Sequence, residues 1–574
     1  MAWRGWLLFG CYVLVTSAAC DDEAADPADA GADAGGDAAV GVVTWHQHVA
    51  PIVMRACAPC HVEGGVAPFA LDSYATTRVM APVALSAIEG GRMPPWMPDP
   101  DCREFEDERL VSDAEKAVFR AWVEAETPEG DAASAAPIEV PTPERFDATH
   151  TTRPIEPYQP DGSVTDDYRC FVLDLEFDRE LFVTASEVVP DAGAIVHHVL
   201  VYALDPTQAR DALAADAESE TPGYPCYGSP LPGGTGDIVD RGSRGVPNQI
   251  ASWVPGAVPD VFPADHAIPI PAGSRVVMQV HYNLQSASPA PDATVVRLVM
   301  SETPPVFELR MRPLMVRTLV IPAGEPAARN AARFVNYGAE PVVLLGVGPH
   351  MHGLGRSLSS VIERADGTRE CLLDVPAWLF EWQQLFSMPS DQWVTVAPGD
   401  AITLECVYDN SPANQPFDDG VQQAPRDVGW GDGTRDEMCM IYLSMSRPYA
   451  PAEASEAACG PAVSGCVAAC AAGGRSTADC LVGCGERAEC TFCALGETPR
   501  CGGAPCGPAL LALREDPCLQ LCFINAAMLG GDASACLRAE CPDAYAAVTG
   551  CLGAVLDAGA CDAPIAAACG LTLP

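Results

Sequence analysis

The chain has 574 residues, which is too long for a single hydrophobic core at about 150 residues per domain, so we expect three or four folded units. Its formal net charge of -44 at pH 7 excludes nucleic acid as a partner, because a polyanion needs a basic surface. After the N-terminal segment no apolar run approaches about 18 residues, so no membrane span is expected there.

The N-terminus carries an export signal. Residues 1–19 combine a basic start, an apolar stretch and small residues at 17–19, the pattern of a signal peptide. Cys20 follows directly, as in bacterial lipoproteins in which this cysteine carries lipid; plain secretion is the alternative, because Ser17 stands where Leu is preferred. An acidic linker fills residues 20–41. We therefore expect a bacterial lipoprotein, periplasmic or anchored to the outer membrane, or a secreted protein, with only a lipid touching the membrane.

Residues 42–130 predict a small α-helical domain around the motif Cys57-Ala58-Pro59-Cys60-His61, and with this motif the domain resembles cytochrome c. The segment Cys57-Ala58-Pro59-Cys60-His61 is the haem c attachment motif, in which two thiols bind the haem vinyl groups and the histidine ligates iron. An ordinary Cys57–Cys60 disulfide with an incidental histidine is the alternative. Met93, on a loop stiffened by prolines, is the predicted sixth ligand of the iron. Its competitors are Met97, Met80, His46 and His48.

The sequence pattern changes twice after this motif, from helical periodicity to a linker and then to strand-like runs. Residues 113–123 are periodic like a helix, with Ser112 as N-cap and Glu115 three positions later. A linker at 131–155 then leads into short apolar or alternating runs separated by Pro and Gly. Such runs predict two antiparallel β-sandwich or jelly-roll domains, at residues 156–303 and 304–449.

The cysteines indicate an oxidising compartment and a stapled tail. Of the 26 cysteines, six lie from Cys102 to Cys439 and sixteen from Cys459 onward, and both even numbers suit a disulfide framework. Residues 450–574 contain pairs spaced four apart, which share one helix face, so we predict α-hairpins stapled by disulfides. These cysteines are Cys466, Cys470, Cys480, Cys484, Cys518 and Cys522, followed by Cys536 and Cys541. A zinc module is disfavoured, because the tail contains no histidine.

Five of the ten histidines lie on three short apolar segments. They are His197, His198, His281, His350 and His352. Taken singly, each is more simply a buried core residue; together they indicate metal sites. Alternation along a strand lets His350 and His352 face one metal with Met351 turned away, whereas the tandem His197-His198 needs a bulge or a strand end. Imidazoles, with the thioether of Met438 as a soft ligand, suit copper.

These segments resemble the type II copper, ascorbate-dependent monooxygenases, the group of dopamine β-monooxygenase and peptidylglycine α-hydroxylating monooxygenase. The resemblance rests on the order His-His, Gln-Val-His-Tyr, His-x-His-x-x-Gly and Asp-Glu-Met-Cys, with support from Trp378-Leu379-Phe380-Glu381-Trp382-Gln383, and it covers about residues 158–449. It implies two jelly-roll domains with one copper each. His197, His198 and His281 would hold the electron-transfer copper, and His350, His352 and Met438 the catalytic one.

The resemblance also implies two disulfides and a substrate cleft. The disulfides are Cys170–Cys226 and Cys406–Cys439, which leaves Cys102 and Cys371 either to pair or to stay free. Tyr442 matches a cleft tyrosine of the peptide-amidating branch. However, Gly348 stands where that branch has a carboxylate-binding arginine, and Met440 replaces its asparagine. These two departures disfavour peptide-glycine amidation and leave the substrate open.

We expect a copper monooxygenase that hydroxylates a C–H bond of a small organic substrate with O2. Its cofactors would be two copper ions and a covalent haem c that delivers electrons to the first copper, with ascorbate or an electron-donor protein as the external reductant. A copper- and haem-binding electron-transfer lipoprotein without catalysis is the alternative. A disulfide-rich adhesion protein would account for the tail but not for the histidines.

Overall fold

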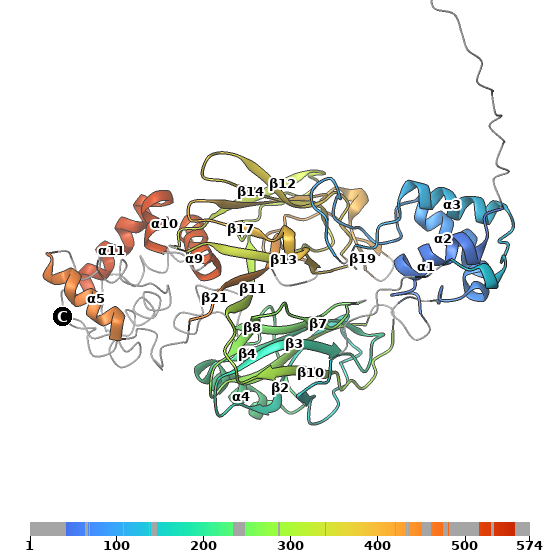
Figure 1. The fold of residues 1–574 in the computed structure, drawn as a ribbon. Coiled ribbons are helices and arrows are strands. Elements are labelled where there is room, and N and C mark those ends of the chain that lie inside the picture. Colours follow the sequence, from blue (N-terminus) through green and yellow to red (C-terminus); the bar gives the residue numbers. More distant parts are fainter. Residues whose placement is uncertain are drawn as a thin grey trace, which may run out of the picture. The chain divides into compact units, whose positions relative to one another are not determined.

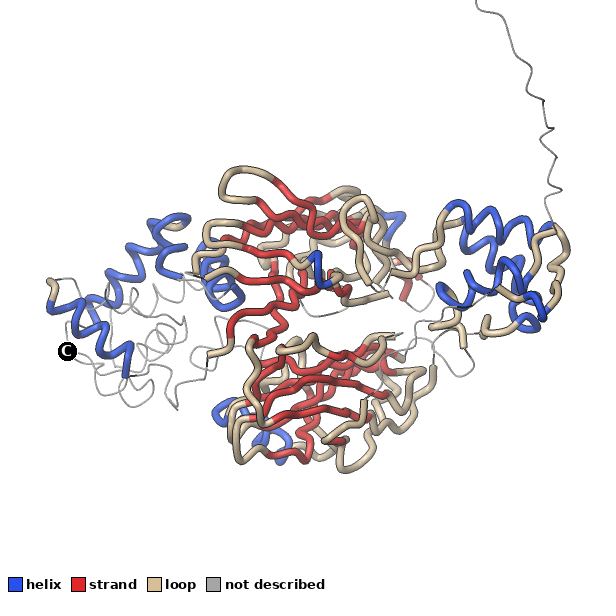
Figure 2. The backbone as a smooth tube through the Cα atoms, viewed as in Figure 1, coloured by secondary structure: helices blue, strands red, loops and turns tan. Residues whose placement is uncertain are grey.

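The computed structural model shows a chain whose middle part is mainly β-sheet and is preceded and followed in sequence by helices, as the labelled ribbon in Figure 1 and the strand and helix colours in Figure 2 show. It describes residues 42–62, 67, 69–106, 108–136, 138, 146–232, 247–255, 257–284, 287–338, 340–380, 382–418, 421–431, 433, 435–450, 461–474, 480, 516–529 and 533–556. The predicted signal peptide, Cys20 and the acidic linker lie outside the described residues. Among those that are described, no helix has the length and apolarity needed to cross a membrane.

The N-terminal helical segment forms its own small core. Its elements are η1 (Trp45–Val49), α1 (Ala50–Ala56), α2 (Tyr74–Glu89), α3 (Asp113–Glu124) and the short η2 (Ala132–Ser134). The predicted cap of α3 is confirmed: Ser112 and Glu115 form a reciprocal capping box, which satisfies backbone N–H groups at the helix start. Trp45, Phe119 and Trp122 are buried together at the centre of this core.

Two β-sandwiches that share one large sheet make up the middle of the chain. A five-stranded sheet has the order β5-β2-β9-β4-β6, and a four-stranded sheet has the order β12-β18-β14-β15. Both face a ten-stranded sheet, in which β1-β10-β3-β8-β11-β21-β13-β16 is the main path, with β17 and β7 at the side. The mostly β architecture agrees with the predicted sandwich fold.

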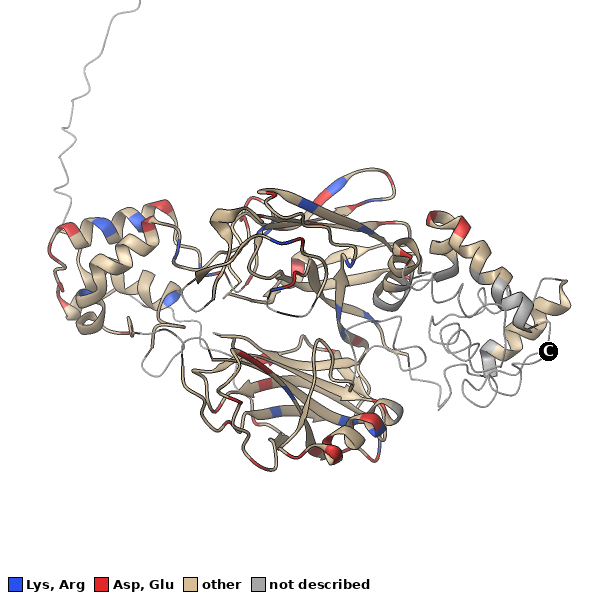
Figure 3. Ribbon diagram, turned by 180° about the vertical axis from the view of Figure 1, so that it is seen from behind, with Lys and Arg blue, Asp and Glu red and all other residues tan. Residues whose placement is uncertain are grey.

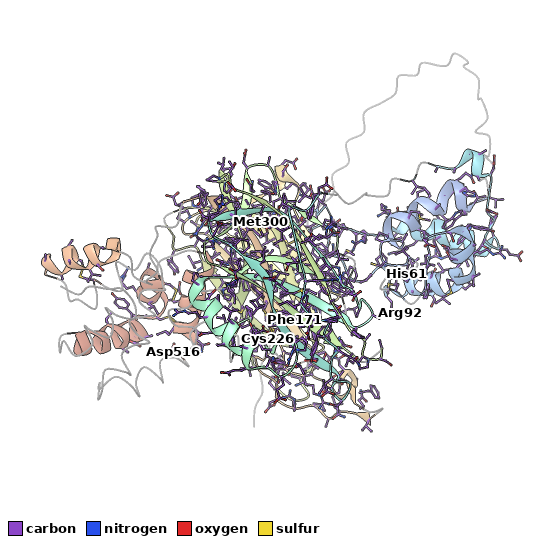
Figure 4. The ribbon with its side chains drawn as sticks, turned by 90° about the horizontal axis from the view of Figure 1, so that it is seen from below. His61, Arg92, Phe171, Cys226, Met300 and Asp516 are labelled. Atoms are coloured by element: carbon purple, nitrogen blue, oxygen red, sulfur yellow. A yellow bond between two sulfur atoms is a disulfide. The ribbon has the colours of Figure 1, made fainter. Side chains whose placement is uncertain are left out.

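The strands of the first half have the following bounds: β1 (His150–Thr152), β2 (Asp166–Glu176), β3 (Leu181–Val189), β4 (Val196–Leu204), β5 (Tyr224–Pro225), β6 (Asn248–Trp253), β7 (Asp260–Val261), β8 (His266–Ile270), β9 (Arg275–Asn283) and β10 (Val295–Ser301). One helix, α4 (Pro206–Glu218), lies between β4 and β5 in the sequence. Alternating buried residues of β2, β3, β4, β9 and β10 fill the core of this half, including Phe171 and Met300, which Figure 4 labels.

The strands of the second half are β11 (Phe307–Met315), β12 (Ala328–Val335), β13 (Val342–His350), β14 (Gly355–Glu363), β15 (Arg369–Val375), β16 (Phe386–Ser387), β17 (Val394–Val396), β18 (Ala401–Tyr408), β19 (Phe417–Asp418), β20 (Val421–Gln422) and β21 (Met440–Pro448). Two short helical turns are η4 (Ser390–Gln392) and η5 (Pro412–Asn414). The ten-stranded sheet runs through both halves because β8 pairs in parallel with β11. The sequence alone suggests two separate sandwiches, and nothing local in it indicates this junction.

A stretch that sequence analysis assigns to the haem domain packs instead on the second β core. Trp96, Met97 and Phe105 are buried in that core, and the Trp96 ring lies 5.0 Å from the Trp378 ring. A disulfide links Cys102 to Cys371, which resolves the open question about these two cysteines. We call residues 96–109 the strap.

The C-terminal tail contains the expected disulfide-stapled helices where it is described. The helices are α5 (Pro461–Ala472), α9 (Pro517–Leu529), α10 (Ala533–Glu540) and α11 (Pro542–Leu556). Cys518–Cys541 and Cys522–Cys536 join the two sides of one hairpin, and Cys470 pairs with Cys480. Asp516 precedes α9 (Figure 4), and the buried Ile524 and Leu529 of α9 extend the second β core. Cys484 lies outside the described residues.

Charged residues are scattered over the helices and sheets on the face shown in Figure 3. Many of them form ion pairs on the surface, such as Arg329 with Glu405 and Arg120 with Glu89. Such exposed pairs contribute little to stability, typically below about 1 kcal/mol.

The strap disulfide should contribute more to stability than the tail disulfides. The Cys102–Cys371 bond joins residues 269 apart in the sequence, whereas Cys518–Cys541 joins residues 23 apart. Because loop-closure entropy grows with loop length, replacing both cysteines of the strap pair by serine should cost about 2–5 kcal/mol. The same change in the tail pair should cost about 2 kcal/mol less. Urea unfolding followed by tryptophan fluorescence measures both, and a larger loss from the tail pair would contradict this account.

Candidate metal centres

The first histidine cluster forms where β4 pairs with β9. The pairing register shifts between Val196 and His198, so His197 is the extra residue of a β-bulge. His198 lies directly opposite His281 of β9. The bulge turns His197 toward the same side as these two residues, which a regular strand would not allow for tandem histidines. This is the irregularity that the tandem pair requires.

Three ring nitrogens converge in this cluster. His197 Nδ1 lies 3.3 Å from His198 Nδ1 and 3.2 Å from His281 Nδ1. Burial, with the neighbouring histidines adding to it, lowers the pKa of His197 to about 4 and holds that of His198 well below its usual range. The imidazoles of His197 and His198 are therefore neutral near pH 7, and the Nδ1 atoms of all three histidines face a common point. Nitrogen ligands about 2.0 Å from one tetrahedral metal would lie about 3.3 Å apart, so the spacing fits a metal ion.

Two neighbours hold His281 in place. Its Nε2 donates to Asp166 Oδ1 at 2.9 Å, which leaves Nδ1 for the cluster. The ring of Tyr168 stacks on the imidazole with centroids 4.1 Å apart and planes 7° apart. Asp166, Tyr168 and His281 come together because β2 pairs with β9, with Tyr168 opposite His281. Sequence analysis missed Asp166 and Tyr168, because only the strand pairing brings them to the histidine.

The second cluster forms at the end of β13. His350 is the last residue of that strand, and His352 follows it with its ring centroid 5.2 Å from that of His350. Met351 is fully buried in the core between them, as strand alternation predicts. Met438 lies just before β21, which pairs with β13 so that Met440 is opposite His350. This pairing brings the thioether residue to the two histidines.

Neutral oxygen atoms orient the two imidazoles. His350 Nδ1 pairs with Gln383 Oε1 at 3.1 Å, and His352 Nδ1 pairs with the backbone oxygen of Asp436 at 2.9 Å. In both rings this leaves Nε2 for a metal ion. Burial lowers the pKa of His350 to about 3 and also lowers the pKa of His352. These two rings, like those of His197 and His198, are neutral near pH 7.

The buried carboxyl group of Glu437 joins the two parts of the second cluster. Glu437 accepts the backbone N–H of His352 at 2.9 Å and that of Leu354 at 2.6 Å. Burial raises its pKa to about 8. Two further bonds hold the adjacent segment that carries Met438. One is the Cys406–Cys439 disulfide, and the other is the hydrogen bond from the Tyr408 hydroxyl to the Met438 carbonyl, at 2.7 Å. Cys170 and Cys226 are also disulfide-bonded.

One cavity of about 180 Å³ is lined by both clusters. Phe380 lies between them, with its ring centroid 5.6 Å from that of His197 and 5.6 Å from that of His352. Tyr442, Met440 and Gly348 also line the cavity. At Gly348 a Cβ atom would lie 3.1 Å from Leu385 Cδ1. Leu385 therefore leaves little room for a side chain at position 348, where the peptide-amidating branch has an arginine.

The motif Cys57-Ala58-Pro59-Cys60-His61 lies at the end of α1. Cys57 and Cys60 are both free thiols, so the disulfide alternative is not formed in this structure. His61 is buried, and its Nδ1 pairs with the Phe69 carbonyl at 3.0 Å, which leaves Nε2 for a metal. Figure 4 labels His61 among these helices. Two thiols and one oriented imidazole on a single turn fit covalent haem attachment.

The candidates for the sixth ligand occupy different surroundings. Met93 is 42% exposed, and Figure 4 labels its neighbour Arg92 in the same helical part. Met97 is buried in the second β core, which makes it a poor ligand for a haem at His61. Met80 packs on the helical core. His46 lies 3.6 Å from Glu129, and His48 accepts the Thr44 backbone N–H.

Comparison with known proteins bears directly on the second cluster. Residues 335–465 match the family model described as the copper type II ascorbate-dependent monooxygenase, C-terminal domain. This segment contains His350, His352 and Met438.

Solved structures add nothing to this match. The major capsid protein P2 of bacteriophage PM2 is 8% identical over 53% of this chain and 98% of its own, with a TM-score of 0.22. A putative secreted protein from Parabacteroides distasonis is 7% identical over 54% of this chain and 93% of its own, with a TM-score of 0.12. These scores are too low to carry an argument. Residues 335–465 of the chain thus match the C-terminal domain of the copper type II, ascorbate-dependent monooxygenase family.

Proposed function

We propose that this protein is a copper-dependent monooxygenase that hydroxylates a C–H bond of a small organic substrate with O2. The observation that carries the proposal is the single cavity lined by two different donor sets, three imidazoles in one and two imidazoles with a thioether in the other. The family match of residues 335–465 supports a copper monooxygenase in general. His197, His198 and His281 would hold one copper, and His350, His352 and Met438 the other.

The donor atoms suit copper better than other common metals. Neutral imidazoles bind copper in either oxidation state, and the thioether of Met438 favours Cu(I). Zinc and magnesium sites rarely use methionine. When bound, copper supplies the one-electron chemistry and the activation of O2 that the reaction requires.

The chain itself binds the substrate and shapes the cavity. Phe380 and Met440 offer apolar surface, and Tyr442 adds an aromatic ring with a hydroxyl group. A volume of about 180 Å³ suits a small molecule rather than a peptide. Leu385 beside Gly348 disfavours the carboxylate-binding arginine of the peptide-amidating enzymes.

We further propose that Cys57 and Cys60 attach a haem c with His61 as a ligand and Met93 as the predicted sixth ligand. This haem would supply electrons to the copper of the first cluster, with ascorbate or an electron-donor protein as the external source. Two contacts between the strap and the loop near the clusters support this electron route: Arg109 donates to Gln384 at 3.2 Å and lies 5.8 Å from the Trp382 ring. The same loop carries Phe380, which contacts His197.

We place the protein outside the cytoplasm, as a lipoprotein or secreted protein. Disulfides in both β halves and in the tail fit an oxidising compartment.

Oxygen consumption tests the enzymatic proposal. Copper-loaded protein supplied with ascorbate should consume O2 and form hydroxylated product from a small aromatic substrate. Met438→Leu keeps the size and apolarity of the side chain but removes the sulfur, so turnover should fall by about a hundredfold or more. Val320→Leu, at an exposed residue outside both clusters, is the matched control and should retain activity. Full turnover by Met438→Leu would contradict the proposal.

Copper content tests the two ligand sets separately. The wild-type protein should bind two copper ions, measured by inductively coupled plasma mass spectrometry with copper EPR. His281→Ala and His352→Ala should each bind one, because each removes a ligand from a different cluster. Loss of both ions in either variant, in protein that remains folded, would contradict independent sites.

Covalent haem tests the role of the attachment motif. Protein exported from a host with a cytochrome c maturation system should show one haem in the pyridine haemochrome assay. Cys57→Ser with Cys60→Ser should remove it, because no thiol remains to bind the vinyl groups, while both copper ions stay. A wild-type protein without covalent haem would contradict this part of the proposal.

A further inference from the structure

The two clusters differ in the charge of the groups behind their histidines. In the first, His281 donates through Nε2 to a carboxylate, Asp166, at 2.9 Å. In the second, His350 and His352 pair with an amide oxygen and a backbone carbonyl oxygen. The buried carboxyl group of Glu437 accepts the backbone N–H groups of His352 and Leu354, and no hydrogen bond from it to the His352 imidazole is described. Only the first cluster therefore has a described hydrogen bond from an imidazole to an anionic group.

Burial, a second hydrogen bond and a stacked ring hold the Asp166–His281 pair in one geometry. The side chain of His281 is 1% exposed and that of Asp166 is 18% exposed, so water screens their interaction poorly. Asn283 donates to the same Oδ1 atom at 3.0 Å, which holds the carboxylate in position. Tyr168, which lies opposite His281 on the neighbouring strand β2, stacks on the imidazole and fixes its plane.

A carboxylate that accepts a hydrogen bond from an imidazole changes the reduction potential of a metal bound to the other nitrogen of that ring. It makes the imidazole a stronger donor and brings negative charge near the metal, and both effects stabilise Cu(II) more than Cu(I). A neutral amide or carbonyl oxygen does this much less. In the second cluster the thioether of Met438 acts in the opposite direction, because a soft ligand stabilises Cu(I).

We propose that Asp166 is a positioning residue that lowers the reduction potential of the copper held by His197, His198 and His281 below that of the copper held by the second cluster. The inference deepens the proposed function and rests on it, since both clusters must bind copper. The asymmetry gives direction to the transfer of one electron. Cu(I) of the first cluster is oxidised to Cu(II), and Cu(II) of the second cluster is reduced to Cu(I).

The test measures one copper at a time. In a His352→Ala background, the copper of the first cluster is titrated against redox mediators and followed by EPR. Asp166→Asn keeps the shape and an acceptor oxygen but removes the charge. It should weaken Cu(II) binding relative to Cu(I) at least tenfold, which raises the midpoint potential by about 59 mV. Asp166→Glu restores the charge and should return the potential toward that of the background protein.

A reciprocal variant serves as the matched test in the second cluster. In a His281→Ala background, Gln383→Glu places a carboxylate behind His350 and should lower the midpoint potential of that copper by a similar amount. It also keeps the inference testable if Asp166→Asn fails to fold.

The outcomes of these experiments distinguish a failure of the inference about Asp166 from a failure of the proposed copper-dependent function. A folded, copper-loaded Asp166→Asn protein with an unchanged potential would overturn the inference alone, and so would Gln383→Glu without effect. A His352→Ala protein that binds no copper at all would overturn the proposed function together with the inference.

Discussion

Much of the site depends on the antiparallel pairing of β4 with β9 and of β9 with β2. One bulge at His197 turns tandem histidines to the same side, and the pairing sets His281 opposite His198. Neighbouring β2 contributes Tyr168 and Asp166 to the same histidine. If the register slipped by one residue, every side chain would exchange faces, and the three Nδ1 atoms would no longer meet. The Cys170–Cys226 disulfide ties β2 to the segment after β5 and supports this arrangement.

The second cluster depends on a different constraint, the buried segment before β21. Glu437 bridges the turn that holds His352, and the adjacent Cys439 is tied to β18 through Cys406. A buried carboxylate with two backbone donors is costly to lose, because the donors would remain unpaired away from water. The strap adds a third constraint, because the Trp96 side chain donates to the Leu379 carbonyl beside Phe380. Trp378, in the same loop, donates to the His352 carbonyl. The loop that separates the clusters is thus held from both ends.

Much of this arrangement can be predicted from the sequence, and the limits have physical causes. Alternation in short apolar runs predicts strands, and cysteines four apart predict the stapled helices of the tail. For the tandem His197-His198 to bind one metal, the sequence requires a bulge or a strand end, and it does not decide between them. Asp166 and Gln383 are not predictable as partners of His281 and His350, since local patterns do not specify which strands and loops become neighbours. The strap is misassigned for the same reason. Its residues follow the haem motif in sequence, but Trp96 and Phe105 find their apolar partners in the second β core.

The central claim is that two copper ions bind through different atoms, Nδ1 in the first cluster and Nε2 with sulfur in the second. Diffraction from crystals of the copper-loaded protein at the copper absorption edge tests it most directly. The account predicts two anomalous peaks, one bonded to Nδ1 of His197, His198 and His281, and one bonded to Nε2 of His350 and His352 and to Sδ of Met438. A single peak, or a first copper bonded to Nε2 of His281 in place of its hydrogen bond with Asp166, would contradict it.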